Sequence, residues 1–229
     1  MAGNRGIVTA VFTDELYTAA RPLWDAQLEH PFVRGLGDGT LPEEIFARWV
    51  LQDYRYLIEF SRVFAFAAAK ADTLESMSWY AAVLNLTLNS EMALHRQYAA
   101  RFGIDQARLE AEPMWPTNRA YTDFLVRTAA AGDLAELVAA LLPCAWGYVH
   151  LAAHLAKQPP PADPRYTDWI AQYTAPEFVE ANEWLKSEMN RLAADAGEQK
   201  RRRLREIFLL SSDYELRFWQ MCWGASCAS

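Results

Sequence analysis

The chain has 229 residues with 52% hydrophobic and 13% aromatic side chains. This composition excludes an intrinsically disordered protein, and the length allows one large domain with a substantial core. The net charge is −7 at neutral pH, which argues against nucleic acid and against an anionic membrane surface as partners.

Apolar residues recur along most of the chain with a period near 3.6, which is typical of helices, and no segment predicts a pair of strands. Glycine and proline divide this pattern into seven predicted helices. They cover residues 13–30, 41–71, 73–102, 117–131, 133–157, 176–196 and 198–223. Thr13 and Thr40 are the expected caps of the first two helices, and Pro22 is expected to kink or interrupt the first. The glycine-rich residues 33–40 are expected to form the turn between them.

Residues 137–156 contain no Asp, Glu, Lys or Arg and form a stretch long enough to span a bilayer. The stretch lacks a flanking Lys/Arg asymmetry and carries Pro143 and His150, so we expect a central buried helix and not a membrane helix. No repeat or flexible linker divides the chain, and the proline-rich residues 158–164 form a stiff connection. The sequence therefore predicts an all-α protein, a single-domain helical bundle over residues 1–229.

Cys144 lies within this apolar stretch, where burial raises the pKa of a thiol and makes it inert unless polar groups reach it. A lone cysteine on an apolar helix is usually a small core residue. Two neighbours favour a functional alternative, because Pro143 removes a backbone hydrogen bond beside the thiol and Tyr148 lies four residues on, on the same face. With Cys222 and Cys227 the chain has three cysteines, too few for a disulfide framework. Because no signal peptide is apparent either, a reducing, cytoplasmic setting is expected.

Two acidic residues interrupt apolar helix faces elsewhere in the chain. Asp53 shares its predicted face with Ile45, Trp49, Tyr56 and Phe60, and Glu215 shares its own with Leu204, Phe208, Ser212, Trp219 and Cys222. A buried carboxylate is costly unless it is paired, so Asp53 either holds a structural partner or binds the N–H groups of a ligand. Desolvation would raise the pKa of Glu215 and let it hold a proton near neutrality, as a general acid must.

Two pairs of potential metal ligands have i, i+4 spacing, namely Glu91 with His95 and His150 with His154. A ferritin-like di-iron bundle needs carboxylates from four helices and two Glu-x-x-His pairs, a motif that the sequence lacks. Histidines satisfied by other groups are the preferred interpretation, and neither a metal nor another cofactor is expected.

Six stretches, spread in order over nearly the whole chain, resemble one family. They are HPFVRGLGDGTLP (30–42), VLQDYRY (50–56), EMALHRQ (91–97), ALLPCAWGY (140–148), WIAQYTAPEF (169–178) and SSDYELRFW (211–219). Together they resemble TenA, also called thiaminase II, an aminopyrimidine aminohydrolase of thiamin salvage, and Cys144 is similar to the cysteine of its Cys-bearing branch. The resemblance implies an all-helical fold like that of haem oxygenase, a homotetramer, and catalysis without a cofactor.

The resemblance also implies roles for individual residues. It places the nucleophile on Cys144, the acid/base on Glu215 and the pyrimidine-binding aspartate on Asp53. The family's active-site tyrosines fall on Tyr56, Tyr121, Tyr148 and Tyr173, with Tyr121 in the least similar stretch. Cys222 and Cys227 match no functional position.

The implied reaction replaces an amine, or the thiazolium of thiamin, by water at the methylene attached to a pyrimidine ring. We expect Cys144 to add to ring carbon C6, after which the leaving group departs from the methylene. Asp53 is expected to orient the amino edge of the ring and Glu215 to transfer a proton, although the two acids could exchange roles. The sequence leaves open whether the physiological substrate is 4-amino-5-aminomethyl-2-methylpyrimidine or thiamin.

Two other functions are compatible with these residues. One is a haem-oxygenase-like, metal-dependent oxidase that uses Glu91 and His95 as ligands. The other is a non-catalytic protein that binds a pyrimidine or thiamin. The thiol and the two acids favour the hydrolase, because a binding protein does not need a nucleophile.

Overall fold

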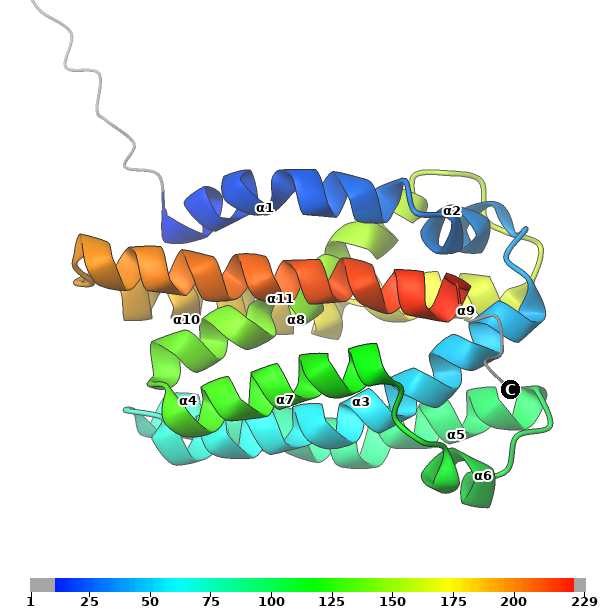
Figure 1. The fold of residues 1–229 in the computed structure, drawn as a ribbon, viewed down its shortest axis with the longest axis horizontal. Helices are drawn as coiled ribbons and strands as arrows, with labels where there is room; N and C mark the ends of the chain where they lie inside the picture. The colour runs from blue at the N-terminus through cyan, green and yellow to red at the C-terminus, as the bar shows by residue number, and fades with distance from the viewer. Residues whose placement is uncertain (1–10, 225–229) are drawn as a thin grey trace, which may run out of the picture.

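The computed structural model describes residues 11–224, which form eleven α-helices and one π-helical segment, with no strand in that range (Figure 1). The elements are α1 (Phe12–Leu28), α2 (Pro31–Asp38), α3 (Glu43–Lys70), α4 (Leu74–Leu86), η1 (Thr87–Glu91), α5 (Met92–Arg101), α6 (Gln106–Ala111), α7 (Pro116–Ala131), α8 (Leu134–Leu155), α9 (Pro164–Tyr173), α10 (Pro176–Ala193) and α11 (Glu198–Gly224). The all-α class predicted from the sequence is confirmed. Cys227 lies outside the described residues.

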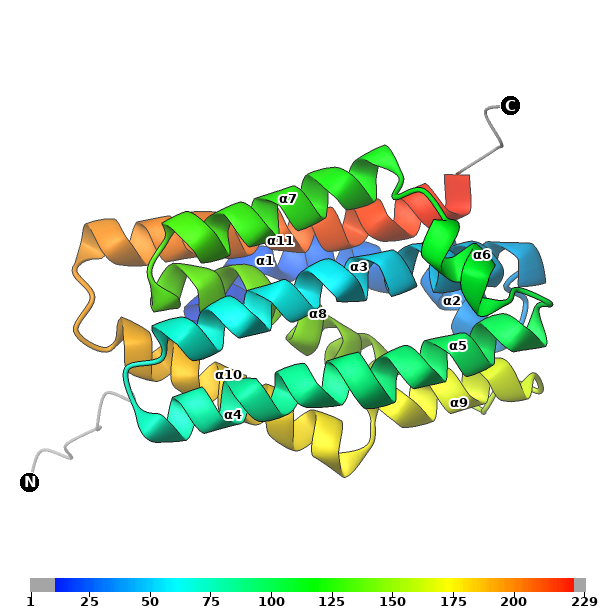
Figure 2. The same cartoon turned by 90° about the horizontal axis from the view of Figure 1, so that it is seen from below.

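The helices form an elongated bundle in which successive long rods run in opposite directions (Figures 1 and 2). One of these rods consists of α4, η1 and α5 in succession (Figure 2). Helix α11 runs nearly the length of the molecule and packs against α1, α7 and α8. Helix α8 in turn contacts α7, α9, α10 and α11, so it lies at the centre of the bundle.

Helix α8 is the apolar stretch that the sequence singles out. Its N-terminus is capped by Asp133, whose carboxylate accepts a hydrogen bond from the Glu136 backbone N–H at 3.0 Å. It continues through Pro143 without ending. Its length and composition would allow it to cross a membrane, but most of its residues are buried against neighbouring helices. The expected central buried helix is therefore confirmed.

The two threonines expected as caps have other partners. The hydroxyl of Thr13, inside α1, accepts a hydrogen bond from the Asn190 side chain at 3.1 Å. The hydroxyl of Thr40 donates to Asp38 at 2.6 Å and makes no cap for α3. Both capping predictions are wrong because α1 begins one residue before Thr13 and α3 begins three residues after Thr40, so Val11 and Pro42 occupy the N-cap positions. Helix α1 contains Pro22 within its span and does not end there.

The glycine-rich residues 33–40 were expected to form a turn, and this prediction is also wrong, because most of them belong to α2. The ring of His30 accepts a backbone N–H and caps this helix. Gly37 serves packing here, since a Cβ on it would lie 2.6 Å from Leu155 Cδ2. Gly39, with φ of 80°, then ends the helix in the left-handed region.

Two further short helices, α6 and α9, were not predicted. Each begins at an aspartate: Asp105 accepts from the backbone N–H of Arg108 at 2.8 Å, and Asp163 accepts from that of Arg165 at 2.9 Å. The π-helical segment η1 was not predicted either, and it widens the rod that the sequence placed at 73–102.

Candidate active site

A cavity of about 180 Å³ lies between α3, α4, η1, α8, α9 and α10. Its wall is largely apolar, with a small number of polar groups, a composition typical of small-molecule sites. The cavity is lined by five of the seven predicted site residues, namely Asp53, Tyr56, Cys144, Tyr148 and Tyr173. The other two, Tyr121 and Glu215, are buried next to this group.

Cys144 faces the cavity from α8. Burial raises the pKa of its thiol well above the ordinary range, and the negative charge of Glu215 raises it further, whereas an interaction with Tyr56 opposes the shift. The resting site therefore holds a neutral thiol that needs a base before it can act as a nucleophile.

Two tyrosine hydroxyls lie near the cavity end of Cys144. Tyr148, on the same helix face as the cysteine, accepts a hydrogen bond from Trp49 Nε1 at 3.3 Å. The hydroxyl next to Cys144 belongs to Tyr56, which is buried and has no other hydrogen-bond partner among the described residues. Tyr56 comes from α3, so sequence proximity to the cysteine could not reveal it.

Glu215 reaches the thiol from α11. Its side chain is 4% exposed, accepts a hydrogen bond from the Tyr121 hydroxyl at 2.5 Å, and is close enough to Cys144 for the thiol to influence its pKa. Burial raises the pKa of Glu215 to about 7, although the hydrogen bonds from Tyr121 and Cys144 partly oppose this rise. The negative charge of Asp53 adds to it. Three helices that are distant in sequence thus bring a thiol and two carboxyl groups together.

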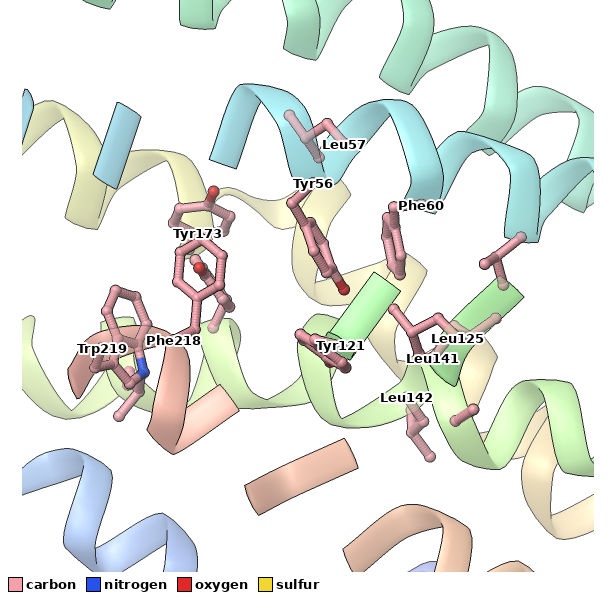
Figure 3. Close-up of a cluster of buried hydrophobic side chains, with 14 of the residues drawn as sticks. Tyr56, Leu57, Phe60, Tyr121, Leu125, Leu141, Leu142, Tyr173, Phe218 and Trp219 are labelled. Atoms are coloured by element: carbon pink, nitrogen blue, oxygen red, sulfur yellow. The ribbon is translucent and has the colours of Figure 1, made fainter. Parts of the chain in front are cut away.

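Tyr121 anchors Glu215 through a short chain of hydrogen bonds. Its hydroxyl lies 3.1 Å from Ser211 Oγ, and Ser211 donates to the carbonyl oxygen of Ala140 on α8 at 2.6 Å. The rings of Tyr56 and Tyr121 approach each other from α3 and α7, with centroids 5.3 Å apart (Figure 3). The family resemblance implied an active-site position for Tyr121, and in the structure its hydroxyl bonds to Glu215.

Asp53 has a buried partner, His95, that lies on a different helix and is not evident from the sequence. Nε2 of His95 lies 2.6 Å from Asp53 Oδ2, and Nδ1 of the same ring lies 3.0 Å from the carbonyl oxygen of Glu91. Burial lowers the pKa of His95, but the hydrogen bond and the charge of Asp53, together with Glu91, outweigh it and raise that pKa. Asp53 is thus held at the cavity wall by a histidine 42 residues away in sequence.

The same contacts bear on the metal-dependent alternative. Both ring nitrogens of His95 already have partners within the fold, so this ring is not placed to bind a metal with Glu91. Across residues 11–224, no group of three or more His, Cys, Asp and Glu side chains is arranged to hold a metal ion.

Aromatic rings form one wall of the cavity. The centroid of Tyr173 lies 4.8 Å from that of Tyr148 and 4.7 Å from that of Trp169. A flat heteroaromatic ligand would gain roughly 0.5–1.5 kcal/mol from such rings beyond the burial of its area. Thiol, carboxyl groups and aromatic wall together define a helical-bundle protein with a site for a flat, nitrogen-containing ring.

Residues 17–225 match the TENA/THI-4/PQQC family, and the chain belongs to that family. An aminopyrimidine aminohydrolase of Halalkalibacterium halodurans is 40% identical over 214 residues, which cover 93% of this chain and 96% of the relative. The family resemblance inferred from the six stretches is confirmed.

Solved structures agree with this assignment. A TenA homologue from P. horikoshii has a TM-score of 0.87 at 29% identity, with 94% of this chain and 99% of the homologue covered. A protein from Shewanella denitrificans with a heme oxygenase-like fold has a TM-score of 0.70 at 13% identity, covering 93% and 92% of the two chains, so it shares the fold alone. The haem-oxygenase-like fold is also confirmed.

Proposed function

We propose that the protein is an aminopyrimidine aminohydrolase of the thiaminase II type in thiamin salvage. Its substrate is 4-amino-5-aminomethyl-2-methylpyrimidine, thiamin, or both, and its product is the hydroxymethylpyrimidine. The observation that carries the proposal is that the Cys144 thiol lines a ring-sized cavity together with Asp53, while the buried Glu215 carboxyl, whose pKa is about 7, interacts with that thiol. The 40% identical relative of the same named activity supports it.

The positions of the three polar side chains suggest how the ring binds. Asp53 accepts a hydrogen bond from the 4-amino group. Cys144 faces C6, and Glu215, which contacts Cys144, faces the neighbouring ring nitrogen N1. Tyr148 and Tyr173 cover the flat surface of the ring.

In the first chemical step, Glu215 accepts the thiol proton of Cys144 and delivers it to N1 while the sulfur bonds to C6. The ring loses its aromaticity, and the lone pair of the 4-amino group can then move through the C4=C5 bond. This movement breaks the bond from the methylene to the leaving group and creates an exocyclic double bond. Asp53 stabilises the positive charge that develops on the amino nitrogen.

In the second half of the reaction, water adds to the exocyclic methylene, which restores the C4=C5 bond and the neutral 4-amino group. The added water gives its excess proton to the departed ammonia or, when a thiazole has left, to solvent. The sulfur leaves C6 as N1 gives up its proton, and Glu215 returns a proton to Cys144. The covalent route divides a difficult displacement into easier steps. A well-placed acid/base of this kind contributes about 10²–10⁴-fold to the rate.

A product assay tests the proposed function. Purified protein is incubated separately with 4-amino-5-aminomethyl-2-methylpyrimidine and with thiamin, and hydroxymethylpyrimidine is quantified by chromatography. We expect multiple turnovers with at least one of the two. Saturable binding of both compounds without any product would instead support the non-catalytic binding protein.

We further propose a cytoplasmic homotetramer of single-domain chains that needs no cofactor and binds neither nucleic acid nor membrane. A reducing compartment suits a site that depends on a free thiol. Exposed apolar side chains on α4 and η1, namely Leu74, Met77, Leu86 and Leu88, offer a surface for subunit contacts. The net charge of −7 supports the absence of polyanionic partners.

A further inference from the structure

A third acidic side chain, Glu91, lines the cavity together with Asp53, and it takes part in none of the proposed chemical steps. It is the last residue of the π-helical segment η1, and the side chain of Thr87, at the first position of η1, interacts with its carboxyl group. Burial raises the pKa of Glu91 to about 7; His95 opposes this rise and the charge of Asp53 adds to it. Glu91 can therefore carry a negative charge near neutrality, and a bound cation would favour that state.

The backbone around Glu91 is held in a fixed position relative to Asp53, the residue proposed to bind the 4-amino group. The carbonyl oxygen of Glu91 lies 3.0 Å from one nitrogen of His95, and the other nitrogen of that ring bonds to Asp53. A π-helical turn often marks a functional position in a helix. Here the turn brings both Thr87 and Glu91 to the cavity wall, while Leu88 between them is exposed.

The order of atoms around the pyrimidine ring determines which substituent of the substrate Glu91 can contact. If Asp53 holds the group on C4 and Cys144 bonds to C6, the substituent on C5 must leave the ring between these two side chains. Glu91 lines the same cavity as Asp53, Cys144 and Tyr173, and its charge raises the pKa of both Cys144 and Tyr173, so its carboxyl group is within electrostatic range of a substituent that leaves the ring between Asp53 and Cys144. The charged and titratable groups around Glu91 are thus Asp53, His95, Cys144 and Tyr173.

We propose that Glu91 binds the leaving group of an amine substrate: its carboxylate accepts hydrogen bonds from the ammonium group of an aminomethyl substituent on C5. This inference rests on the proposed function and refines its substrate class, because it makes a primary amine the substrate for which the cavity is built. A carboxylate pairs strongly with an ammonium group in such a partly desolvated position.

The role follows from the chemistry of the bond that breaks. A primary amine departs from carbon readily only as neutral ammonia, so its nitrogen must carry three protons beforehand. Glu91 maintains that protonation state. When the C–N bond breaks, its electron pair stays on nitrogen, ammonia leaves, and the carboxylate is unchanged. The thiazolium nitrogen of thiamin has no N–H and leaves as a neutral thiazole, so it does not need this acceptor.

The test compares Glu91→Gln with the wild type on both substrates. We expect kcat/KM for 4-amino-5-aminomethyl-2-methylpyrimidine to fall about 10–100-fold and that for thiamin to change less than about 3-fold. Glu177→Gln is the matched control, because Glu177 lines the same cavity, is exposed, and loses the same charge. We expect Glu177→Gln to change either value less than about 3-fold.

A binding measurement separates leaving-group recognition from a general disturbance of the site. In a Cys144→Ser background, Glu91→Gln is expected to raise the Kd of the aminomethyl compound about 10-fold or more, and that of the hydroxymethyl compound less than about 3-fold. If wild type forms product but Glu91→Gln retains full activity on the amine, or loses activity and affinity equally for all compounds, the role of Glu91 is refuted. If wild type forms product from neither substrate, the proposed function fails and this inference fails with it.

Discussion

Cys144→Ser is expected to reduce kcat at least about 10³-fold on every substrate, because the covalent step depends on sulfur. A serine hydroxyl is a much weaker acid than a thiol, so Glu215, with a pKa of about 7, cannot generate the alkoxide. The substitution leaves the cavity wall otherwise intact. The Kd for hydroxymethylpyrimidine, measured by titration calorimetry, should therefore change less than about 3-fold.

Cys222→Ala provides the control for this experiment. Cys222 is fully buried on α11, on the helix stripe that also carries Glu215, and its thiol does not line the cavity. We expect it to retain wild-type kcat. Turnover by Cys144→Ser at the wild-type rate, or an equal loss in both variants, would contradict a covalent role for Cys144.

Glu215→Gln is expected to lower kcat by about 10²–10⁴-fold, because the amide cannot carry the proton from Cys144 to the ring. An amide has nearly the shape of the carboxyl group and can still accept the hydrogen bond from Tyr121. Binding of hydroxymethylpyrimidine should therefore change much less than turnover. A kcat within about 3-fold of wild type would remove Glu215 as the proton carrier.

The same substitution should change the pH dependence of stability. In the folded state the pKa of Glu215 is about 7, whereas in the unfolded chain it is about 4.3. Between these values the folded state keeps a proton that the unfolded state has lost. The contribution of this group to the free energy of unfolding therefore falls as pH rises from about 4 to 7, in total by roughly 4 kcal/mol.

Glutamine carries no charge at any pH, so the free energy of unfolding of Glu215→Gln should lack this contribution. The difference in stability between the variant and the wild type should therefore shift in favour of the variant as pH rises from about 4 to above 7. Urea denaturation of both proteins at several pH values measures the effect. If the two proteins showed the same slope of stability against pH, the raised pKa of Glu215 would be contradicted.

The sequence predicted the long rods of the bundle because their apolar period extends over many turns. It missed α2, α6 and α9, which are short and lie in segments rich in glycine, proline or polar residues. In α2, Gly37 permits close packing against Leu155 and does not form a turn, a distinction that only the tertiary contact reveals. The π-helical segment η1 has no recognisable periodic signal, so the widened turn at Glu91 could not be predicted.

The apolar faces of two helices predicted that Asp53 and Glu215 are buried acids, as they are in the structure. The family resemblance implied the set of site residues, and five of them line one cavity. The pairing within the site depends on tertiary structure. Asp53 meets His95 across 42 residues, and Tyr56, not Tyr148, meets the thiol. The i, i+4 spacing of Glu91 and His95 allows a shared metal ion, but a histidine satisfied by another group was the preferred interpretation. In the structure the His95 ring bonds to Asp53 while Glu91 lines the cavity.

The most direct test of covalent catalysis is the secondary kinetic isotope effect of deuterium at ring carbon C6. Addition of Cys144 converts C6 from trigonal to tetrahedral, and deuterium favours the tetrahedral state. The deuterated and protiated forms of one substrate compete in the same reaction. The substrate that turns over more slowly is used, so that binding steps do not mask the effect. The deuterated pyrimidine should then react faster than the protiated one. Equal rates for the two would mean that C6 keeps its geometry during turnover, and would contradict addition of the thiol to the ring.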